Sequence, residues 1–337
     1  NFPLLYNISA FETKTKMKLY TINGIVDTIL SPNDSILHTK YILHHALMSL
    51  EPQTGFVRAW VGGIDHNYYQ YDNVYKGKRQ VGSTFKPFVY ATAIDQHNFS
   101  PCEKIPNIPV VFDKTEWHLR RDWVPKNSDG EYGGEFSLKN ALANSMNTIT
   151  AFLMKKVGPE KVINLARKMG ITAELPAVPS LCLGTADISL FEMVGAYGTF
   201  ANKGVYTKPS FIERIEDRQG TILYQYQPET NAALSEEKAY VMLNLMEEVT
   251  KVGSGQRLRF RYDIRNPVAG KTGTTQNNMD GWFIGTVPNL VTGVWTGCQD
   301  PAVRFNRTYY GQGANMALPI WGEMMKRVYA DSTLNIS

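Results

Sequence analysis

The sequence has few of the features that mark a metalloprotein, a membrane span or a nucleic-acid binder. Its 337 residues include only three cysteines, Cys102, Cys182 and Cys298, and these are widely spaced. No Cys/His cluster has metal-ligand spacing, so we expect no metal site, and the odd number of cysteines argues against a disulfide framework. No apolar run reaches 18 residues, which predicts no membrane-spanning helix. The net charge of +4 gives no reason to expect a nucleic-acid partner.

A secretory signal peptide is also missing, and the sequence opens with NFPLLYNISAFETKTK rather than with a methionine. We expect a mature or excised piece of a longer protein. The missing leader and anchor therefore carry no weight against an exported protein.

Apolar residues make up 43% of the chain, which suffices for a sizeable core. Apolar runs around turn residues predict β-hairpins at 46–63, 211–226 and 281–298. Helical patterns cover 83–95, 137–157, 159–170, 187–204, 234–255 and 315–330. Hairpins near both ends and helices between them predict an α+β fold, an antiparallel sheet with a helical lobe. Residues 1–45 are interpreted as a linker or small appended piece, 46–330 as the main domain and 331–337 as a tail.

The stretch QVGSTFKPFVYATAI, residues 80–94, places Ser83 and Lys86 at the start of an apolar helix. Pro87 is tolerated only in the first turn, so the helix should begin close to Ser83. Lys86 then lies one turn from Ser83 on the same face. A lysine whose pKa is lowered by burial can remove the proton of a serine, and a helix N-terminus can donate amides to an oxyanion.

S-x-x-K is a weak pattern by itself, and it occurs a second time at Ser235–Lys238. There the serine precedes an acidic, exposed first turn and is interpreted as an ordinary N-cap. Ser83 differs because a long apolar run follows Lys86, and buried lysines require a reason.

Two further segments carry polar groups that suit the same chemistry. Lys271-Thr272-Gly273-Thr274 precedes the last hairpin and is expected on a strand edge, with Thr272 and Thr274 on one face and Gly273 permitting close approach. Two hydroxyls and an ammonium there would suit a carboxylate, although β-propensity alone also explains the threonines. Ser145 and Asn147 interrupt an apolar helical stretch, but an isolated S-x-N carries almost no information.

The three segments occur in the order S-x-x-K, S-x-N, K-T-G, which is the motif set of serine penicillin-binding proteins and class A β-lactamases. From about residue 46 to 330 the chain resembles the transpeptidase domain of a class A (bifunctional) penicillin-binding protein. This resemblance implies an antiparallel sheet flanked by helices, with a helical lobe that carries the S-x-N motif. The resemblance includes SLEPQTGFVRAWVGG, GSTFKPFVYATAI, WVPKNSDGEYGG, NALANSMNT, FANKG, GKTGTTQNNMDGWFIG and VWTG.

The resemblance implies a role for each motif residue: Ser83 as the acylated nucleophile, Lys86 as its base, Ser145 as a proton shuttle, Asn147 as a ligand of the substrate amide, Lys271 as the source of the local field, and Thr272 and Thr274 as ligands of the terminal carboxylate of a D-Ala-D-Ala stem peptide. The amides of Ser83 and Thr274 would form the oxyanion hole.

As partners it implies peptidoglycan stem peptides, an acceptor amine and β-lactam antibiotics, with no cofactor. It also implies an extracytoplasmic domain that is anchored to the membrane in the full-length protein, beside a glycosyltransferase domain absent from these residues.

Other interpretations of the three motifs remain open. A β-lactamase would need a base for deacylation, and no E-x-x-L-N segment lies between 147 and 271; Glu160 to Asn164 sits in an ordinary amphipathic helix. A carboxypeptidase would differ only in its acceptor groove. A non-catalytic antibiotic sensor would need a transmembrane partner segment, and a purely structural domain would not need all three motifs.

Overall fold

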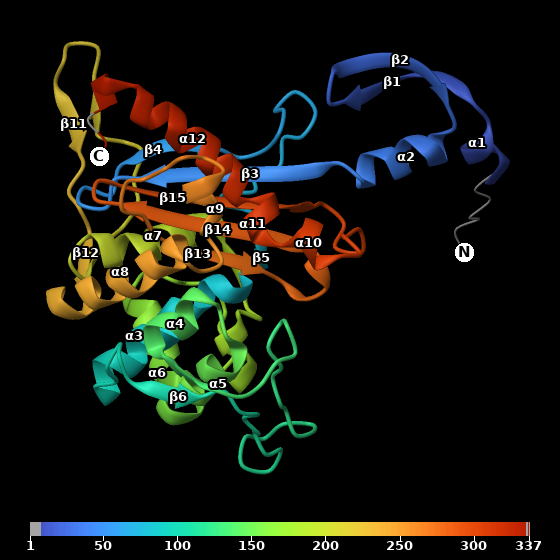
Figure 1. Cartoon of the computed structure of the whole chain (residues 1–337). Helices are drawn as coiled ribbons and strands as arrows, with labels where there is room; N and C mark the ends of the chain where they lie inside the picture. The colour runs from blue at the N-terminus through green and yellow to red at the C-terminus, as the bar shows by residue number, and fades with distance from the viewer. Residues whose placement is uncertain (1–7, 335, 337) are drawn as a thin grey trace, which may run out of the picture.

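A five-stranded antiparallel sheet forms the centre of the computed structural model, which describes residues 8–334 and residue 336 (Figure 1). The strand order is β13-β14-β15-β3-β4. Their bounds are β3 Leu43–Leu50, β4 Val57–Val61, β13 Ala269–Thr274, β14 Asp280–Val287 and β15 Leu290–Cys298. The predicted hairpins at 46–63 and 281–298 are confirmed, as is the α+β class.

Both faces of this sheet are covered, because successive residues of a strand point to opposite sides. Ala46, Met48 and Leu50 of β3 belong to the larger core cluster, which includes residues of α7 (Leu190–Ala201). Leu47 belongs to a second cluster with Trp321 of α12 (Leu318–Ala330). The sheet is therefore the middle layer between two sets of helices.

The helical lobe lies below the sheet in Figure 1. It contains α3 Lys86–His97, α4 Leu138–Ala143, α5 Asn147–Val157 and α6 Pro159–Lys168, and α8 Glu236–Lys251 lies between α4 and β13. The prediction of one helical stretch over 137–157 was wrong in one respect. The chain leaves the helix after α4 and begins α5 at Asn147, because Ser145 takes a left-handed backbone conformation with φ of 56°.

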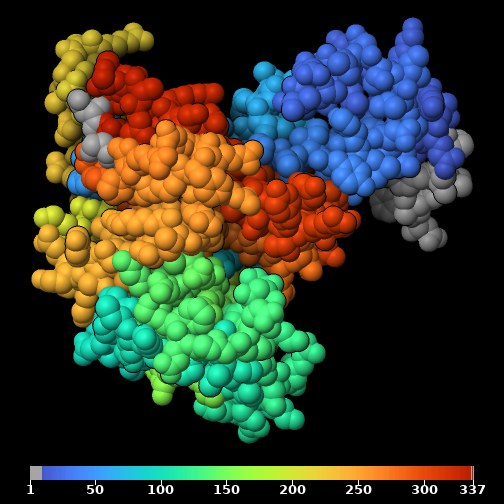
Figure 2. All heavy atoms as spheres, in the orientation of Figure 1, coloured from blue at the N-terminus to red at the C-terminus, as the bar shows by residue number. Residues whose placement is uncertain are grey.

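Residues 8–40 form a small unit for which the sequence predicted no elements. It consists of α1 Ile8–Glu12, β1 Thr15–Thr21, β2 Gly24–Leu30 and α2 Pro32–Lys40. The unit projects from the body of the molecule (Figure 2). The ring of Tyr20 packs against Tyr68 and Tyr69, and Lys40 forms an ion pair with Asp300. The division of the chain at residue 45 remains a prediction.

The remaining elements are short. They are β5 Lys78–Gln80, β6 Lys104–Pro106, β7 Glu135–Ser137, β8 Asp187–Ser189, β9 Val205–Thr207, β10 Arg214–Glu216, β11 Ile222–Gln225, β12 Thr230–Ala232, α9 Arg257–Phe260, α10 Thr308–Gly311 and α11 Gly313–Met316, with 3-10 turns η1 Gly82–Phe85, η2 Pro179–Leu183, η3 Gln276–Asn278 and η4 Ser332–Leu334. The hairpin predicted at 211–226 is β10–β11. The closing helix is divided into α11 and α12. Within residues 8–334 and 336, no helix is both long and apolar enough to cross a bilayer.

Candidate functional site

The fold brings the three sequence motifs together from separate elements. Ser83 lies in the 3-10 turn η1, and Lys86 is the first residue of α3, with Pro87 in its first turn as predicted. Ser145 lies in the break between α4 and α5, and the strand Lys271–Thr274 is at the edge of the sheet. The site therefore lies where the sheet edge meets the helical lobe.

Lys86 is fully buried and its ammonium is held by the S-x-N segment. Nζ donates to the carbonyl oxygen of Ser145 at 2.5 Å and to Oδ1 of Asn147 at 2.7 Å, and it lies 3.2 Å from Oγ of Ser145. Burial lowers the pKa of Lys86 to about 7, an effect that outweighs the opposite influence of Cys182. Near neutral pH a large fraction of Lys86 is therefore a free amine that can accept a proton.

Lys271 is the second fully buried lysine of the site. Its Nζ donates to Oγ of Ser145 at 2.9 Å and to the carbonyl oxygen of Thr272 at 3.1 Å. Burial, reinforced by the positive charge of Lys86, holds the pKa of Lys271 well below that of a free lysine. The hydroxyl of Ser145 thus lies between two amines, and a proton on one amine disfavours a proton on the other. This position suits the hydroxyl to pass a proton between them.

The carboxamide of Asn147 is fixed at both ends. Oδ1 accepts from Lys86, and Nδ2 donates to the carbonyl oxygen of Lys126 at 2.7 Å. Because a backbone carbonyl oxygen can only accept, the Lys126 contact settles which end of the amide is nitrogen. One N–H of Asn147 remains for a ligand.

A buried amide network supports this geometry, and the sequence did not predict it. Oδ1 of Asn127 accepts from the backbone N–H groups of Asn147 and Thr148, at 2.8 and 3.2 Å, and so satisfies free amides at the start of α5. Nδ2 of Asn127 donates to Oδ1 of Asn107, which also accepts from the hydroxyl of Thr148. Asn127 stands in WVPKNSDGEYGG, but nothing in the sequence connects it with a helix that begins 20 residues later.

Gly82 and Gly273 allow η1 and β13 to meet backbone to backbone. Gly82 has φ of 53°, and a Cβ there would lie 2.7 Å from the carbonyl oxygen of Thr274. A Cβ at Gly273 would lie 2.8 Å from the carbonyl oxygen of Val81. Real side chains do not tolerate such distances, so only glycine permits this approach. The segment around Ser83 is thereby placed directly beside the Thr274 peptide.

Two side-chain contacts tie the same segment to the sheet. Nε of Arg79, in β5, donates to Oδ1 of Asp280 at 2.7 Å, and Asp280 is almost fully buried. The indole N–H of Trp282 donates to the carbonyl oxygen of Gln80 at 2.8 Å. The strand that leads into η1 is therefore fixed against β14 just before it reaches Ser83.

The hydroxyls of Thr272 and Thr274 each have a protein partner. Oγ1 of Thr272 lies 2.6 Å from Oγ of Ser254, and Oγ1 of Thr274 accepts from the backbone N–H of Gly313 at 3.0 Å. The antiparallel register pairs Thr272 with Phe283 and Thr274 with Gly281, so both residues face one side of the strand as predicted. Lys271 faces the other side, toward the lobe.

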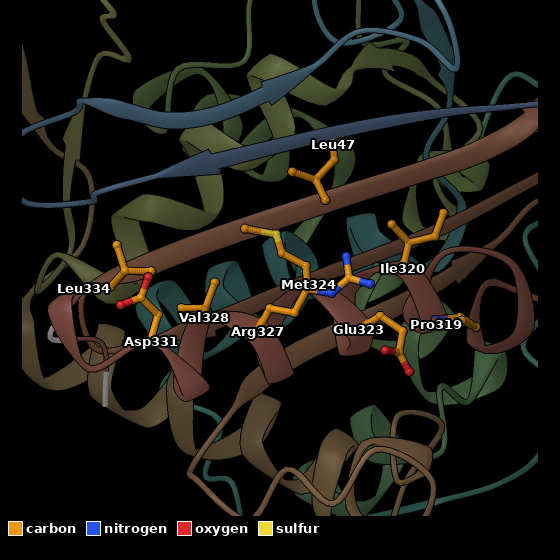
Figure 3. Close-up of a pocket in the computed structure, with 9 residues that line it drawn as sticks. All are labelled: Leu47, Pro319, Ile320, Glu323, Met324, Arg327, Val328, Asp331 and Leu334. Atoms are coloured by element: carbon orange, nitrogen blue, oxygen red, sulfur yellow. The ribbon is translucent and has the colours of Figure 1, made fainter.

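A cavity of about 670 Å³ lies elsewhere. Figure 3 shows it between Leu47 and the side chains of α12, among them Ile320, Met324 and Val328. None of the motif residues lines it, and it lies on the face of the sheet that α12 covers. The chemistry suggested by the sequence therefore has to be sought at the sheet edge and not in this cavity.

Comparisons with known proteins identify the family. The profile of the penicillin binding protein transpeptidase domain matches residues 46–296, and that of the penicillin-binding protein middle domain matches residues 8–43. Penicillin-binding protein 1A of Pseudomonas aeruginosa is 33% identical over 86% of this chain, and its counterpart in Aquifex aeolicus is 35% identical over 85%. The chain spans only about 40% of the length of these relatives.

Solved structures show the same architecture. The crystal structure of penicillin-binding protein 1A from Haemophilus influenzae covers 93% of this chain, and 50% of its own length, with a TM-score of 0.78 at 24% identity. PonA1 of Mycobacterium tuberculosis in complex with penicillin V covers 84%, and 77% of its own length, with a TM-score of 0.70 at 25% identity. On the profile match and the sequence identity of its relatives, the chain belongs to the penicillin-binding protein transpeptidase family.

Proposed function

We propose that this chain is a D,D-transpeptidase domain that cross-links peptidoglycan stem peptides through an acyl-enzyme on Ser83, and that β-lactams acylate the same serine. The observation that carries the proposal is the convergence of Lys86 and Lys271 on the hydroxyl of Ser145, with Lys86 itself three residues after Ser83. A buried amine with a pKa of about 7 is a competent base at neutral pH.

In the first half-reaction, the neutral amine of Lys86 takes the hydroxyl proton of Ser83, and Oγ attacks the carbonyl carbon of the penultimate D-Ala. The amides of Ser83 and Thr274 stabilise the oxyanion. The C–N bond then breaks, the proton passes through Ser145 to the leaving nitrogen, and D-Ala departs. The one free N–H of Asn147 would bind the amide of the donor peptide. Thr272 and Thr274 would bind the carboxylate of the same peptide, and Gly273 between them would let the peptide backbone come close.

In the second half-reaction, an amine of a neighbouring stem peptide attacks the ester carbonyl. Its proton returns through the same groups to Oγ of Ser83, and an amide cross-link forms. A β-lactam follows only the first half, because its leaving group stays tethered. Such a substrate places the domain outside the cytoplasmic membrane, as part of a longer anchored protein that also carries the glycosyltransferase.

The test is incubation with penicillin V, followed by intact mass and by measurement of remaining drug. We expect one covalent adduct that persists for many minutes, and D-Ala release from a D-Ala-D-Ala donor that rises when an acceptor amine is added. Rapid drug loss without an adduct would instead indicate a β-lactamase. D-Ala release insensitive to the amine would indicate a carboxypeptidase.

Gly82→Ala is expected to lower the free energy of unfolding by at least about 1 kcal/mol, since a left-handed backbone costs an L-residue about that much, and to slow acylation. The added Cβ meets the carbonyl oxygen of Thr274 and pushes η1 away from β13. Chemical denaturation and the acylation rate measure the two effects. Gly220→Ala is the matched control, because Gly220 also has positive φ (87°) but no atom within 4 Å of its Cβ position. Equal acylation rates for both variants would contradict the prediction.

A further inference from the structure

The loop between α8 and α9 joins the lobe to the edge strand of the sheet. The backbone N–H of Ser254 donates to the carbonyl oxygen of Ala143, the last residue of α4, at 3.0 Å. Gly253 lies so close to the same carbonyl that no side chain would fit there, and the N–H of Gly255 donates to the carbonyl oxygen of Val249 at 2.9 Å. The loop is thus held by backbone bonds on both sides of Ser254.

From this fixed position the Ser254 side chain reaches Thr272. The two hydroxyl oxygens are 2.6 Å apart, and either can be the donor. Thr272 is 6% exposed, whereas Ser254 is half-buried. The pair holds two hydroxyl protons and consumes one of them in its own bond, so one proton remains for a ligand.

The neighbouring threonine shows how this proton can be directed. Oγ1 of Thr274 accepts from the N–H of Gly313, a group that can only donate, and so its own proton is free to point elsewhere. If Ser254 donates to Oγ1 of Thr272, the hydroxyl proton of Thr272 is likewise free to point elsewhere. Both threonines then present a proton from the same face of β13, and a carboxylate has two oxygens to accept them. A carboxylate arriving at this edge favours that orientation, because a donated bond polarises the hydroxyl and strengthens the next bond in the chain.

We propose that Ser254 is a positioning residue that turns the Thr272 proton toward the carboxylate of the donor peptide or the β-lactam, and so sets the preference for ligands with a free carboxylate. The proposal rests on the proposed function, because that function places the carboxylate at Thr272 and Thr274. Ser254 acts through Thr272 and is not required for the proton transfers at Ser83.

The test compares penicillin V with its methyl ester on the wild type, Ser254→Ala and Ser254→Thr. Loss of one oriented donor to a charged group should lower the second-order rate of acylation by penicillin V about fivefold to tenfold in Ser254→Ala. The ester, which lacks the charge, should acylate both proteins at rates within about twofold of each other. Ser254→Thr retains the hydroxyl and should restore the preference for the free acid. Saturation kinetics should place the loss in the apparent binding constant and leave the limiting acylation rate unchanged.

Three outcomes would overturn the proposal. Equal losses with acid and ester would show that the loop only supports the fold. An unchanged acid-to-ester ratio in Ser254→Ala, with normal acylation, would refute the role of Ser254 alone. Failure of the wild type to form any adduct with penicillin V would remove the proposed function as well. Thermal denaturation of each variant identifies a fold defect independently of these ratios.

Discussion

Replacing Ser83 with alanine is expected to abolish covalent labelling by penicillin V completely. The reason is chemical: the adduct is an ester of Oγ, and alanine has no oxygen to form it. Since the backbone of η1 and the bonds of Lys86 to Ser145 and Asn147 do not involve the Ser83 side chain, the fold should persist. Intact mass after incubation with the drug measures the adduct, and the melting temperature checks the fold.

Ser235→Ala is the control within the same chain. Ser235 opens the other S-x-x-K sequence, and its side chain accepts from the backbone N–H of Lys238 as the N-cap of α8. Its loss should cost about 1 kcal/mol of stability and leave the adduct unchanged. An adduct that survives in Ser83→Ala, or one that disappears in Ser235→Ala with an intact fold, would assign the nucleophile elsewhere.

Lys86→Met should reduce the acylation rate by roughly 10²- to 10⁴-fold, the range expected for removal of a general base. In the wild type, the second-order acylation rate should rise with pH and level off above the pKa of about 7, where the amine is unprotonated. Lys86→Met should acylate slowly, and its acylation rate should not show this rise with pH. Stopped-flow kinetics from pH 5.5 to 9 would measure both. Wild-type rates that fall from pH 6 to pH 8 would contradict the role of Lys86 as the base.

The same lysine predicts a dependence of stability on pH. A free lysine has a pKa of 10.5, whereas burial lowers that of Lys86 to about 7. Between these values the unfolded chain binds one more proton than the folded one, so stability rises with pH, by at most about 1.4 kcal/mol per pH unit for one proton. Below pH 7 this contribution is flat and the cost of the buried charge is at its full value. Lys86→Met should remove this contribution. The rise of the unfolding free energy between pH 7 and 9 should then be smaller by at most about 1.4 kcal/mol per pH unit.

The sequence predicted the elements whose determinants are local. Pro87 indicated where α3 begins, and the turn at Pro288-Asn289 indicated the β14–β15 hairpin. The break at Ser145 could not be predicted, because a helical pattern continues through it; bonds from Lys86 and Lys271, distant in sequence, accompany the left-handed residue. In the hairpin of β1 and β2, Leu19 is the only buried residue, so these strands have almost no core-facing side for a sequence pattern to reflect.

The candidate site also contains both residues that the sequence predicted and residues that it did not. The motif residues were recognised because their order along the chain is distinctive, and the structure brings Lys86, Ser145, Asn147 and Lys271 together. Asn127 and Ser254 were missed because each acts on a segment some 20 residues away, in contacts that the sequence does not display. Their roles, like those of the motif residues, remain predictions for the experiments above.

The central sheet imposes an order of assembly on the molecule. β3 pairs with β15, and the hydroxyls of Ser49 and Thr292, 243 positions apart in the chain, lie 2.8 Å from one another. During synthesis β3 and β4 leave the ribosome long before β15, the strand that pairs with β3, exists. Folding dominated by such distant pairings is slow. The segment around Ser83 therefore cannot reach its final position before β13 is made, and the proposed acyl-transfer site cannot form until the last strands exist.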